Sequence, residues 1–260
     1  MRGSIAWLRC RSRCGRSEVE LNGDLVVVTG GTRGIGLAVV NAVRRRGART
    51  VAISRAPAEK ASMRYQADVT SRADLERVRD ELDAEGLVPG VLVANAGTIT
   101  RKPFLEVADG EMRDMITTNV YGTMVTLQVF APMMLRRRGA RFIVVGSISG
   151  LHGMNLRVVY SSTKAALAGL VRSLAIEWGP LGATVNAVAP GIIRTPFIQG
   201  YVESHPERAE AAVRNTPMGR LGEPDDVAEV VAAMASDAFR FVTGQVITVD
   251  GGVTAGSAWW

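Results

Sequence analysis

Short apolar runs alternate with amphipathic stretches along most of this 260-residue chain. The runs are rich in Val and Ile and only four to six residues long. Runs of this kind are typical of strands that are buried on both faces of a parallel sheet. The pattern predicts strands over 25–28, 50–53, 63–67, 91–94, 142–145, 184–189 and 246–249.

Segments with helical periodicity lie between these runs, and several of them end at Gly or Gly-Pro. Helices are predicted over 37–46, 72–84, 110–135 and 223–236, within 192–222, and through Tyr160 to Trp178. This alternation predicts a single α/β domain over 21–260, a Rossmann-type doubly wound parallel sheet with helices on both faces. Residues 1–20 are predicted to be a disordered, Arg-rich N-terminal extension.

The net charge of +6 has a local origin. Residues 1–17 hold five arginines and no acid, which leaves 26 basic against 25 acidic residues in the rest of the chain. A nearly neutral domain argues against nucleic acid as a partner, and the apolar runs are too short to span a membrane. Cys10 and Cys14, the two cysteines, are too few for a metal site. A domain without cysteine suits the cytoplasm.

A glycine-rich loop, TGGTRGIG from Thr29 to Gly36, joins the first predicted strand to the first helix. Glycines let the backbone approach a pyrophosphate, and a helix N-terminus offers N–H groups and partial positive charge. The spacing differs from the standard G-x-G-x-x-G, although the strand–turn–helix context is the same. We expect this loop to bind a dinucleotide through Gly30, Thr32, Arg33, Gly34, Ile35 and Gly36.

The end of the second predicted strand bears on the choice of cofactor. In a doubly wound sheet this point approaches the adenosine ribose, where an acidic residue would bind the 2′-hydroxyl. The chain has Ser54 and Arg55 there, with Arg33 in the glycine loop. A hydroxyl and two guanidinium groups suit a 2′-phosphate. We therefore predict NADP(H) as the preferred cofactor, with NAD(H) as the alternative.

Tyr160 and Lys164 are four residues apart on a predicted helix and share one face. The pKa of an ordinary Tyr is near 10, about 3 units above neutral pH, which corresponds to about 4 kcal/mol. One cation about 4 Å away, at an effective dielectric constant near 20, supplies about that amount. Ser147, beyond the strand 142–145, adds a hydroxyl that can polarise a carbonyl. A lone Tyr-x3-Lys pair is more often part of an ordinary amphipathic helix face. The other motifs of the chain are therefore needed to decide whether this pair is catalytic.

Over residues 21–252 these motifs resemble the short-chain dehydrogenase/reductase family. TGGTRGIG is similar to its cofactor loop, Asn95-Ala96-Gly97 to its NAG motif, and Tyr160-x3-Lys164 with Ser147 thirteen residues earlier to its catalytic set. The resemblance implies hydride transfer between a nicotinamide cofactor and a ketone or secondary alcohol. It implies that the catalytic residues are Asn119, Ser147, Tyr160 and Lys164. It further implies cofactor contacts by Asp68, Val69, Asn95, Ala96, Gly97, Tyr160, Lys164, Pro190, Gly191, Ile193 and Thr195.

Each role implied by the resemblance makes chemical sense. Tyr160 would exchange the proton with the substrate oxygen, and Ser147 would hydrogen-bond the carbonyl. Lys164 would hold the nicotinamide ribose and lower the Tyr160 pKa, and Asn119 would hold a water molecule. Hydride addition leaves a developing alkoxide, which needs a nearby donor and a matched acid. The family also implies a homotetramer.

Two substrate classes remain open. The glycine loop, the SISG run at 147–150 and the VDGG run at 249–252 are similar to 3-oxoacyl-carrier-protein reductases, in which 136–138 would meet an acidic carrier protein. NAGTITRKPF at 95–104 and TPMGRLGEPDD at 216–226 resemble dehydrogenases of sugar acids and polyols, in which Arg101 and Lys102 would face a carboxylate. We predict a 3-oxoacyl thioester reductase-like enzyme, with a sugar-acid or polyol dehydrogenase as the alternative. A non-catalytic NADP-binding protein is a third hypothesis.

Overall fold

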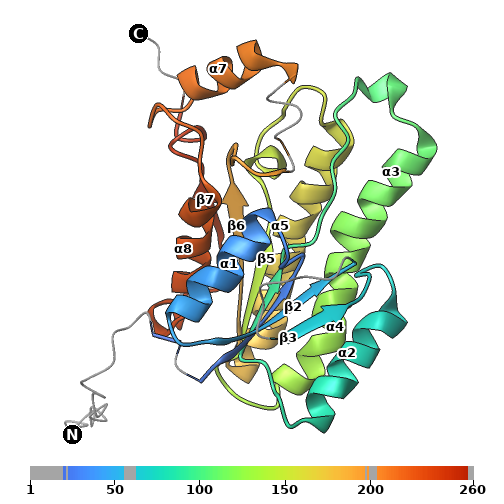
Figure 1. The fold of residues 1–260 in the computed structure, drawn as a ribbon, viewed down its shortest axis with the longest axis vertical. Helices are drawn as coiled ribbons and strands as arrows, with labels where there is room; N and C mark the ends of the chain where they lie inside the picture. The colour runs from blue at the N-terminus through green and yellow to red at the C-terminus, as the bar shows by residue number, and fades with distance from the viewer. Residues whose placement is uncertain (1–19, 22, 56–62, 197, 199–203, 257–260) are drawn as a thin grey trace, which may run out of the picture.

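The computed structural model describes residues 20–21, 23–55, 63–196, 198 and 204–256. Seven strands form one parallel sheet in the order β3-β2-β1-β4-β5-β6-β7 (Figure 1). The predicted doubly wound sheet is confirmed, and each predicted strand ends within one residue of the observed one. The predicted extension over 1–20 lies outside the described residues apart from Glu20. The strands are β1 Leu25–Thr29, β2 Arg49–Ser54, β3 Met63–Gln66, β4 Val91–Ala94, β5 Arg141–Val145, β6 Thr184–Pro190 and β7 Val246–Val249.

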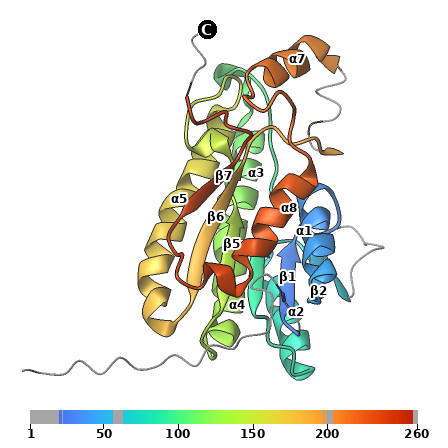
Figure 2. The same cartoon turned by 90° about the vertical axis from the view of Figure 1, so that its left-hand side faces the viewer.

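Helices cover both faces of the sheet (Figure 2). Helices α1 (Gly34–Arg45) and α8 (Pro224–Met234) pack on one face, and α2 (Arg72–Ala84), α4 (Gly122–Met134) and α5 (Val158–Trp178) pack on the other. Each face has its own apolar core, because the strands are buried on both sides. Helix α7 (Pro206–Arg214) and the start of α3 (Asp109–Ile116) lie beyond the carboxyl ends of the strands (Figure 1).

The helix predicted over 110–135 contains a wider turn that the sequence does not reveal. Between α3 and α4 the backbone forms a π-helical turn over Thr117–Tyr121. The hydroxyl of Thr123 donates a hydrogen bond of 2.8 Å to the carbonyl of Asn119, which satisfies a carbonyl within this turn. π-Turns occur frequently at functional sites, and this one contains Asn119, which is fully buried.

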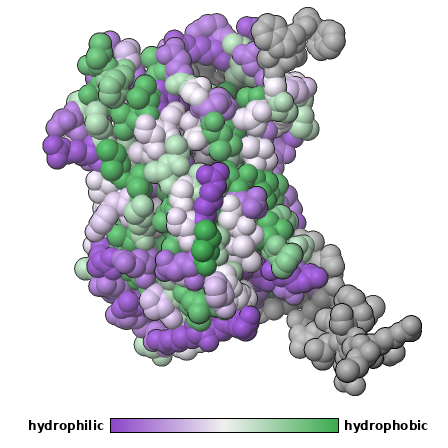
Figure 3. All heavy atoms as spheres, turned by 180° about the vertical axis from the view of Figure 1, so that it is seen from behind, coloured by the Kyte–Doolittle hydropathy of each residue, from purple (hydrophilic) through white to green (hydrophobic). Residues whose placement is uncertain are grey.

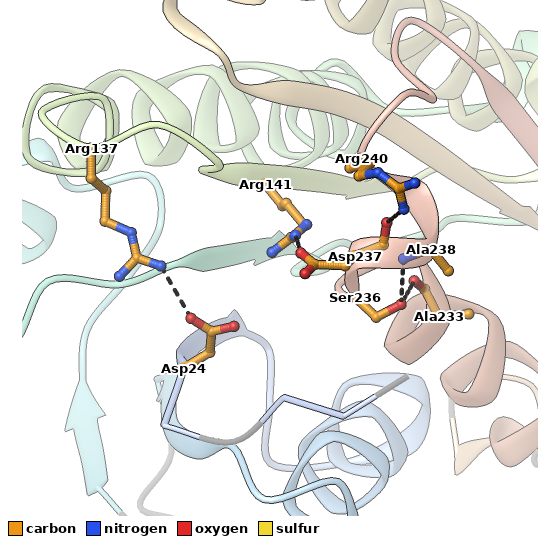
Figure 4. Close-up of polar contacts among 8 residues, drawn as sticks. All are labelled: Asp24, Arg137, Arg141, Ala233, Ser236, Asp237, Ala238 and Arg240. Atoms are coloured by element: carbon orange, nitrogen blue, oxygen red, sulfur yellow. Dashed lines mark hydrogen bonds and ion pairs between the residues drawn. The ribbon is translucent and has the colours of Figure 1, made fainter. Parts of the chain in front are cut away.

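Ion pairs gather at the amino ends of the strands, opposite the carboxyl ends (Figure 4). Arg141, whose side chain is only 9% exposed, pairs at 2.5 Å with Asp237. Arg137 pairs with Asp24 at 3.1 Å, just before β1. Arg136 pairs with Asp83. The basic run 136–138 therefore lies at the sheet edge remote from the strand carboxyl ends. None of the helices in the described ranges is long and apolar enough to cross a membrane.

Candidate active site

A cavity of about 680 Å³ opens at the carboxyl ends of the strands, a size that accommodates a dinucleotide together with a small substrate. The topology explains its position, since ligands of open α/β sheets bind at this edge. All but two of the predicted site residues line it. Asn119 and Gly36 lie behind its wall. The predicted residues that line it are Gly30, Thr32, Arg33, Gly34, Ile35, Ser54, Arg55, Asp68, Val69, Asn95, Ala96, Gly97, Ser147, Tyr160, Lys164, Pro190, Gly191, Ile193 and Thr195.

The glycine loop is held against the end of β4 by a set of hydrogen bonds. The amide of Asn95 donates to the carbonyls of Thr29 and Gly30 at 3.0 and 3.2 Å. The hydroxyl of Thr29 accepts from the backbone N–H groups of Asn95 and Ala96 at 3.0 and 3.2 Å. A Cβ atom at Gly36 would lie 2.6 Å from the Asn95 amide nitrogen, so only glycine fits there. The loop therefore forms a tight cradle at the start of α1, as a pyrophosphate requires.

The residues expected near the adenosine surround one end of the cavity. Ser54 and Arg55 follow β2, and Arg33 is the N-terminal flanking residue of α1, with an exposed side chain. Asp68 follows β3, where its carboxylate accepts from the N–H and hydroxyl of Thr70 at 2.9 and 2.8 Å. The structure thus brings two guanidinium groups and a hydroxyl to the end where a 2′-phosphate would lie.

At the other end, Ser147 and Tyr160 meet across the cavity floor. Ser147 lies just beyond β5, and Tyr160 lies in the first turn of α5. Burial raises the pKa of the Tyr160 phenol, while a hydrogen bond from Ser147 lowers it and the charges of Arg157 and Arg101 lower it further. A half-buried phenol beside a hydroxyl is an arrangement that can bind a carbonyl oxygen and transfer a proton to it.

The ammonium of Lys164 lies near the Tyr160 ring and is held by a backbone carbonyl. Its ammonium donates to the carbonyl of Val145 at 2.8 Å and lies 5.8 Å from the centre of the Tyr160 ring. Burial lowers the pKa of Lys164 to about 8. The charges that lower the Tyr160 pKa most in this structure are those of Arg157 and Arg101. The expected effect of Lys164 on the Tyr160 pKa stays a prediction.

Asn119 connects three parts of the site from behind the cavity wall. Its amide oxygen accepts from the N–H of Thr98 at 2.8 Å, and its amide nitrogen donates to the Thr98 carbonyl at 2.9 Å and to the Thr163 hydroxyl at 3.1 Å. A Cβ atom at Gly97 would lie 3.2 Å from the Asn119 amide oxygen. Asn119 therefore fixes the loop after β4 against α5. Its expected role of holding a water molecule stays a prediction.

The structure separates two cations that look equivalent in the sequence and adds a third. Arg101 lines the cavity, whereas Lys102 forms an ion pair of 2.7 Å with Glu111. Of the two residues expected to face a substrate, only Arg101 lines the cavity. Arg157 also lines the cavity, three residues before Tyr160. Sequence reasoning missed Arg157, although its position directly before the Tyr160 helix was a signal that could have found it.

Comparison with known proteins agrees with this geometry. A family model described as enoyl-(acyl carrier protein) reductase matches residues 30–254. Galactitol 2-dehydrogenase of Rhizobium johnstonii is 35% identical over 253 residues, covering 92% of this chain and 98% of its own. The 3-oxoacyl-acyl-carrier-protein reductase of Escherichia coli is 33% identical over 244 residues, covering 90% and 99%. The structure of a candidate NAD(P)-dependent gluconate 5-dehydrogenase from Beutenbergia cavernae, with NADP bound at low occupancy, superposes with a TM-score of 0.85, at 33% identity and covering 92% and 100%.

Proposed function

Because the chain belongs to the short-chain dehydrogenase/reductase family, we propose that it interconverts a ketone and a secondary alcohol with NADP(H) as the preferred cofactor. The observation that carries this proposal is the half-buried Tyr160 side chain, hydrogen-bonded with Ser147, in the same cavity as the glycine loop. We place the enzyme in the reducing cytoplasm because residues 21–260 contain no cysteine.

The residues divide the work of the reaction. When bound, the nicotinamide cofactor supplies or accepts the hydride. Ser147 and Tyr160 hold the carbonyl oxygen, and Tyr160 gives it a proton as negative charge develops. Lys164 lies beneath Tyr160 on the same helix, where its ammonium would meet the hydroxyls of the nicotinamide ribose. Asn119 keeps the loop carrying Gly97 and Thr98 in place through its hydrogen bonds with Thr98.

The two substrate classes are not equally supported. A carrier protein that delivers a 3-oxoacyl thioester would have to dock near the cavity, but 136–138 lies at the opposite sheet edge. Arg101, by contrast, lines the cavity, as expected for an enzyme of sugar acids.

We retain ketone reduction as the proposal. Its test is the loss of reduced-cofactor absorbance with a panel of acetoacetyl thioesters, keto-sugar acids, cyclic ketones and diketones. Tight NADPH binding without turnover of any carbonyl would favour the non-catalytic hypothesis instead.

Cofactor preference is expected to depend on the two arginines at the adenosine end. Replacing Arg33 or Arg55 with Ala removes a charge-assisted contact to the 2′-phosphate and should weaken NADPH binding about 10- to 100-fold. NADH binding should change little, because NADH has a hydroxyl at that position. Arg49 begins the same strand, β2, at its far end, so Arg49→Ala is the matched control. Calorimetry with both cofactors measures the difference, and an equal loss for NADH and NADPH would contradict the assignment.

We also propose a homotetramer assembled through α4 and α5. Seen from the side of these helices, hydrophobic residues spread across the middle of the surface (Figure 3). Exposed apolar side chains of this region include Tyr121, Met124, Val158 and Ile176, the last 79% exposed. Patches of this kind usually mark protein interfaces. Light scattering after size-exclusion chromatography should give four times the mass of one chain, and Ile176→Glu should lower it. A wild-type monomer would refute the proposal.

A further inference from the structure

The cavity is strongly asymmetric in charge. Of the described residues that line it, five are cationic (Arg33, Arg55, Arg101, Arg157 and Lys164) and one, Asp68, is acidic. Asp68 follows the edge strand β3, whereas Ser147, the hydrogen-bond partner of Tyr160, follows β5, and three strands lie between β3 and β5 in the sheet. Arg33 and Arg55 lie at the adenosine end. Two arginines, Arg101 and Arg157, therefore remain at the catalytic end, where no dinucleotide phosphate is expected.

Arg101 and Arg157 come from two loops that are joined by their backbones. The N–H of Lys102 donates to the carbonyl of Leu156 at 3.2 Å, so the residues next to the two arginines are hydrogen-bonded to each other. Leu156 has a φ of +60°, an unusual conformation for a bulky side chain. Strain of this kind persists where the surrounding structure imposes it, and it concentrates at functional sites.

The side chain of Arg157 is also positioned. One of its terminal nitrogens lies 3.2 Å from the Met154 sulfur, which in turn accepts from the Ser149 hydroxyl at 2.9 Å. Both arginines are partly buried. The charges of both reach the Tyr160 phenol. Two preorganised guanidinium groups near a proton donor form a specific site for an oxyanion of the substrate.

We propose that Arg101 and Arg157 bind the carboxylate of the substrate, so that the enzyme acts on keto acids and the corresponding hydroxy acids. This inference rests on the proposed ketone reduction and deepens it. The ketone oxygen lies between Ser147 and Tyr160, and the carboxylate lies toward the two arginines. The same arrangement favours acidic over neutral substrates, because a carboxylate forms charge-assisted hydrogen bonds with guanidinium groups that a neutral group cannot match.

The test compares keto acids with their primary amides, which have nearly the same shape but no charge. The panel contains 2-, 3-, 4- and 5-oxo acids of increasing length and 5-keto-D-gluconate. In the wild-type enzyme kcat/KM for the best acid should exceed that for its amide by at least about 10-fold. Arg101→Met and Arg157→Met should each lower kcat/KM for the acid about 10- to 100-fold, mainly through KM. Arg157→Lys, which keeps the charge, should recover part of the loss.

Lys102→Met is the matched control. It removes a cation from the same loop, but that cation is paired with Glu111, so the preference for acids should persist. Equal losses for acids and amides in the arginine variants would overturn the proposal, since they would indicate a general effect on Tyr160 or on the loops. A stronger preference for a ketose phosphate than for any keto acid would also overturn the assignment to carboxylates.

A binding measurement separates this inference from the proposed function. Calorimetric titration of the hydroxy-acid products into Tyr160→Phe saturated with NADP⁺ requires no turnover. Binding that is lost in the double variant with Arg157→Met would support the carboxylate site even if every carbonyl failed as a substrate. Turnover of neutral ketones by the wild type, without any preference for acids, would leave ketone reduction standing and refute the carboxylate site.

Discussion

Tyr160→Phe should lower kcat about 100- to 10,000-fold, the range that a positioned general acid contributes. Phe keeps the ring in the first turn of α5 and removes only the hydroxyl, so NADPH binding should be nearly unchanged. The remaining hydroxyl of Ser147 could still polarise the carbonyl, but nothing at that position would supply the proton. Stopped-flow turnover with the best substrate of the panel, alongside NADPH titration, measures both quantities.

Tyr65→Phe is the control for loss of a phenol, because Tyr65 lies on β3 at the edge of the sheet. Its activity should match that of the wild type. If Tyr160→Phe retained more than about a tenth of the wild-type kcat, Tyr160 would not be the proton donor. A loss of NADPH binding of the same size as the loss of kcat would instead indicate damage to the cofactor site.

The direction of the pKa shift of Tyr160 adds a pH dependence to this expectation. Because burial raises the pKa of its phenol in the protein alone, the side chain carries its proton at pH 7. The proton required for reduction is therefore in place, whereas oxidation requires the phenolate. We expect the rate of reduction to be nearly constant from pH 6 to 8 and the rate of oxidation to increase as the pH rises. The increase in oxidation should be absent in Tyr160→Phe.

The sequence predicted those parts of the fold that follow from short apolar runs. A strand such as Val91–Ala94 is buried on both faces and bounded by Gly90 and Asn95, so composition and position both mark it. The π-helical turn around Asn119 was not predictable in this way. One extra residue in a turn barely disturbs the apolar stripe of a long helix, and the feature becomes visible only through the Asn119 and Thr123 contacts.

The candidate site likewise contains residues that the sequence predicted and residues that only the structure revealed. Gly30, Ser147 and Tyr160 occupy positions fixed by strand ends and helix starts, which the pattern locates. Arg101 and Lys102 are adjacent in the sequence, but Arg101 lines the cavity and Lys102 forms an ion pair with Glu111. Glu111 lies on α3 and contacts this loop only in the folded protein. The sequence could have singled out Arg157 by its position directly before α5, but no sequence rule predicts the left-handed conformation of Leu156 before it. Loop side chains therefore needed the structure.

Lys164→Met should abolish activity while preserving or raising stability, an outcome that few active-site substitutions produce. Lys164 is 7% exposed, and burial lowers its pKa to about 8 from 10.5. At neutral pH the folded protein therefore holds a desolvated ammonium, which opposes folding. Met has a similar length and no charge that requires solvation. The substitution removes the hydrogen bond to the Val145 carbonyl, which should lower the stability by about 1 kcal/mol.

The pH dependence of stability distinguishes this account from a general effect of the substitution. Between pH 8 and 10.5 the unfolded chain binds a proton at Lys164 that the folded protein has released, so the free energy of unfolding must rise with pH. At about 1.4 kcal/mol per pKa unit the full effect is of order 3 kcal/mol. The raised pKa of Tyr160 lowers the free energy of unfolding above pH 10, so the rise should appear between pH 8 and 10.

Urea unfolding of the cofactor-free protein should show this rise in the wild type and in Lys102→Met, but not in Lys164→Met. Parallel curves for all three proteins would mean that Lys164 is not the group that titrates. The account of Lys164 as a buried ammonium with a lowered pKa, placed to bind the nicotinamide ribose, would then be refuted.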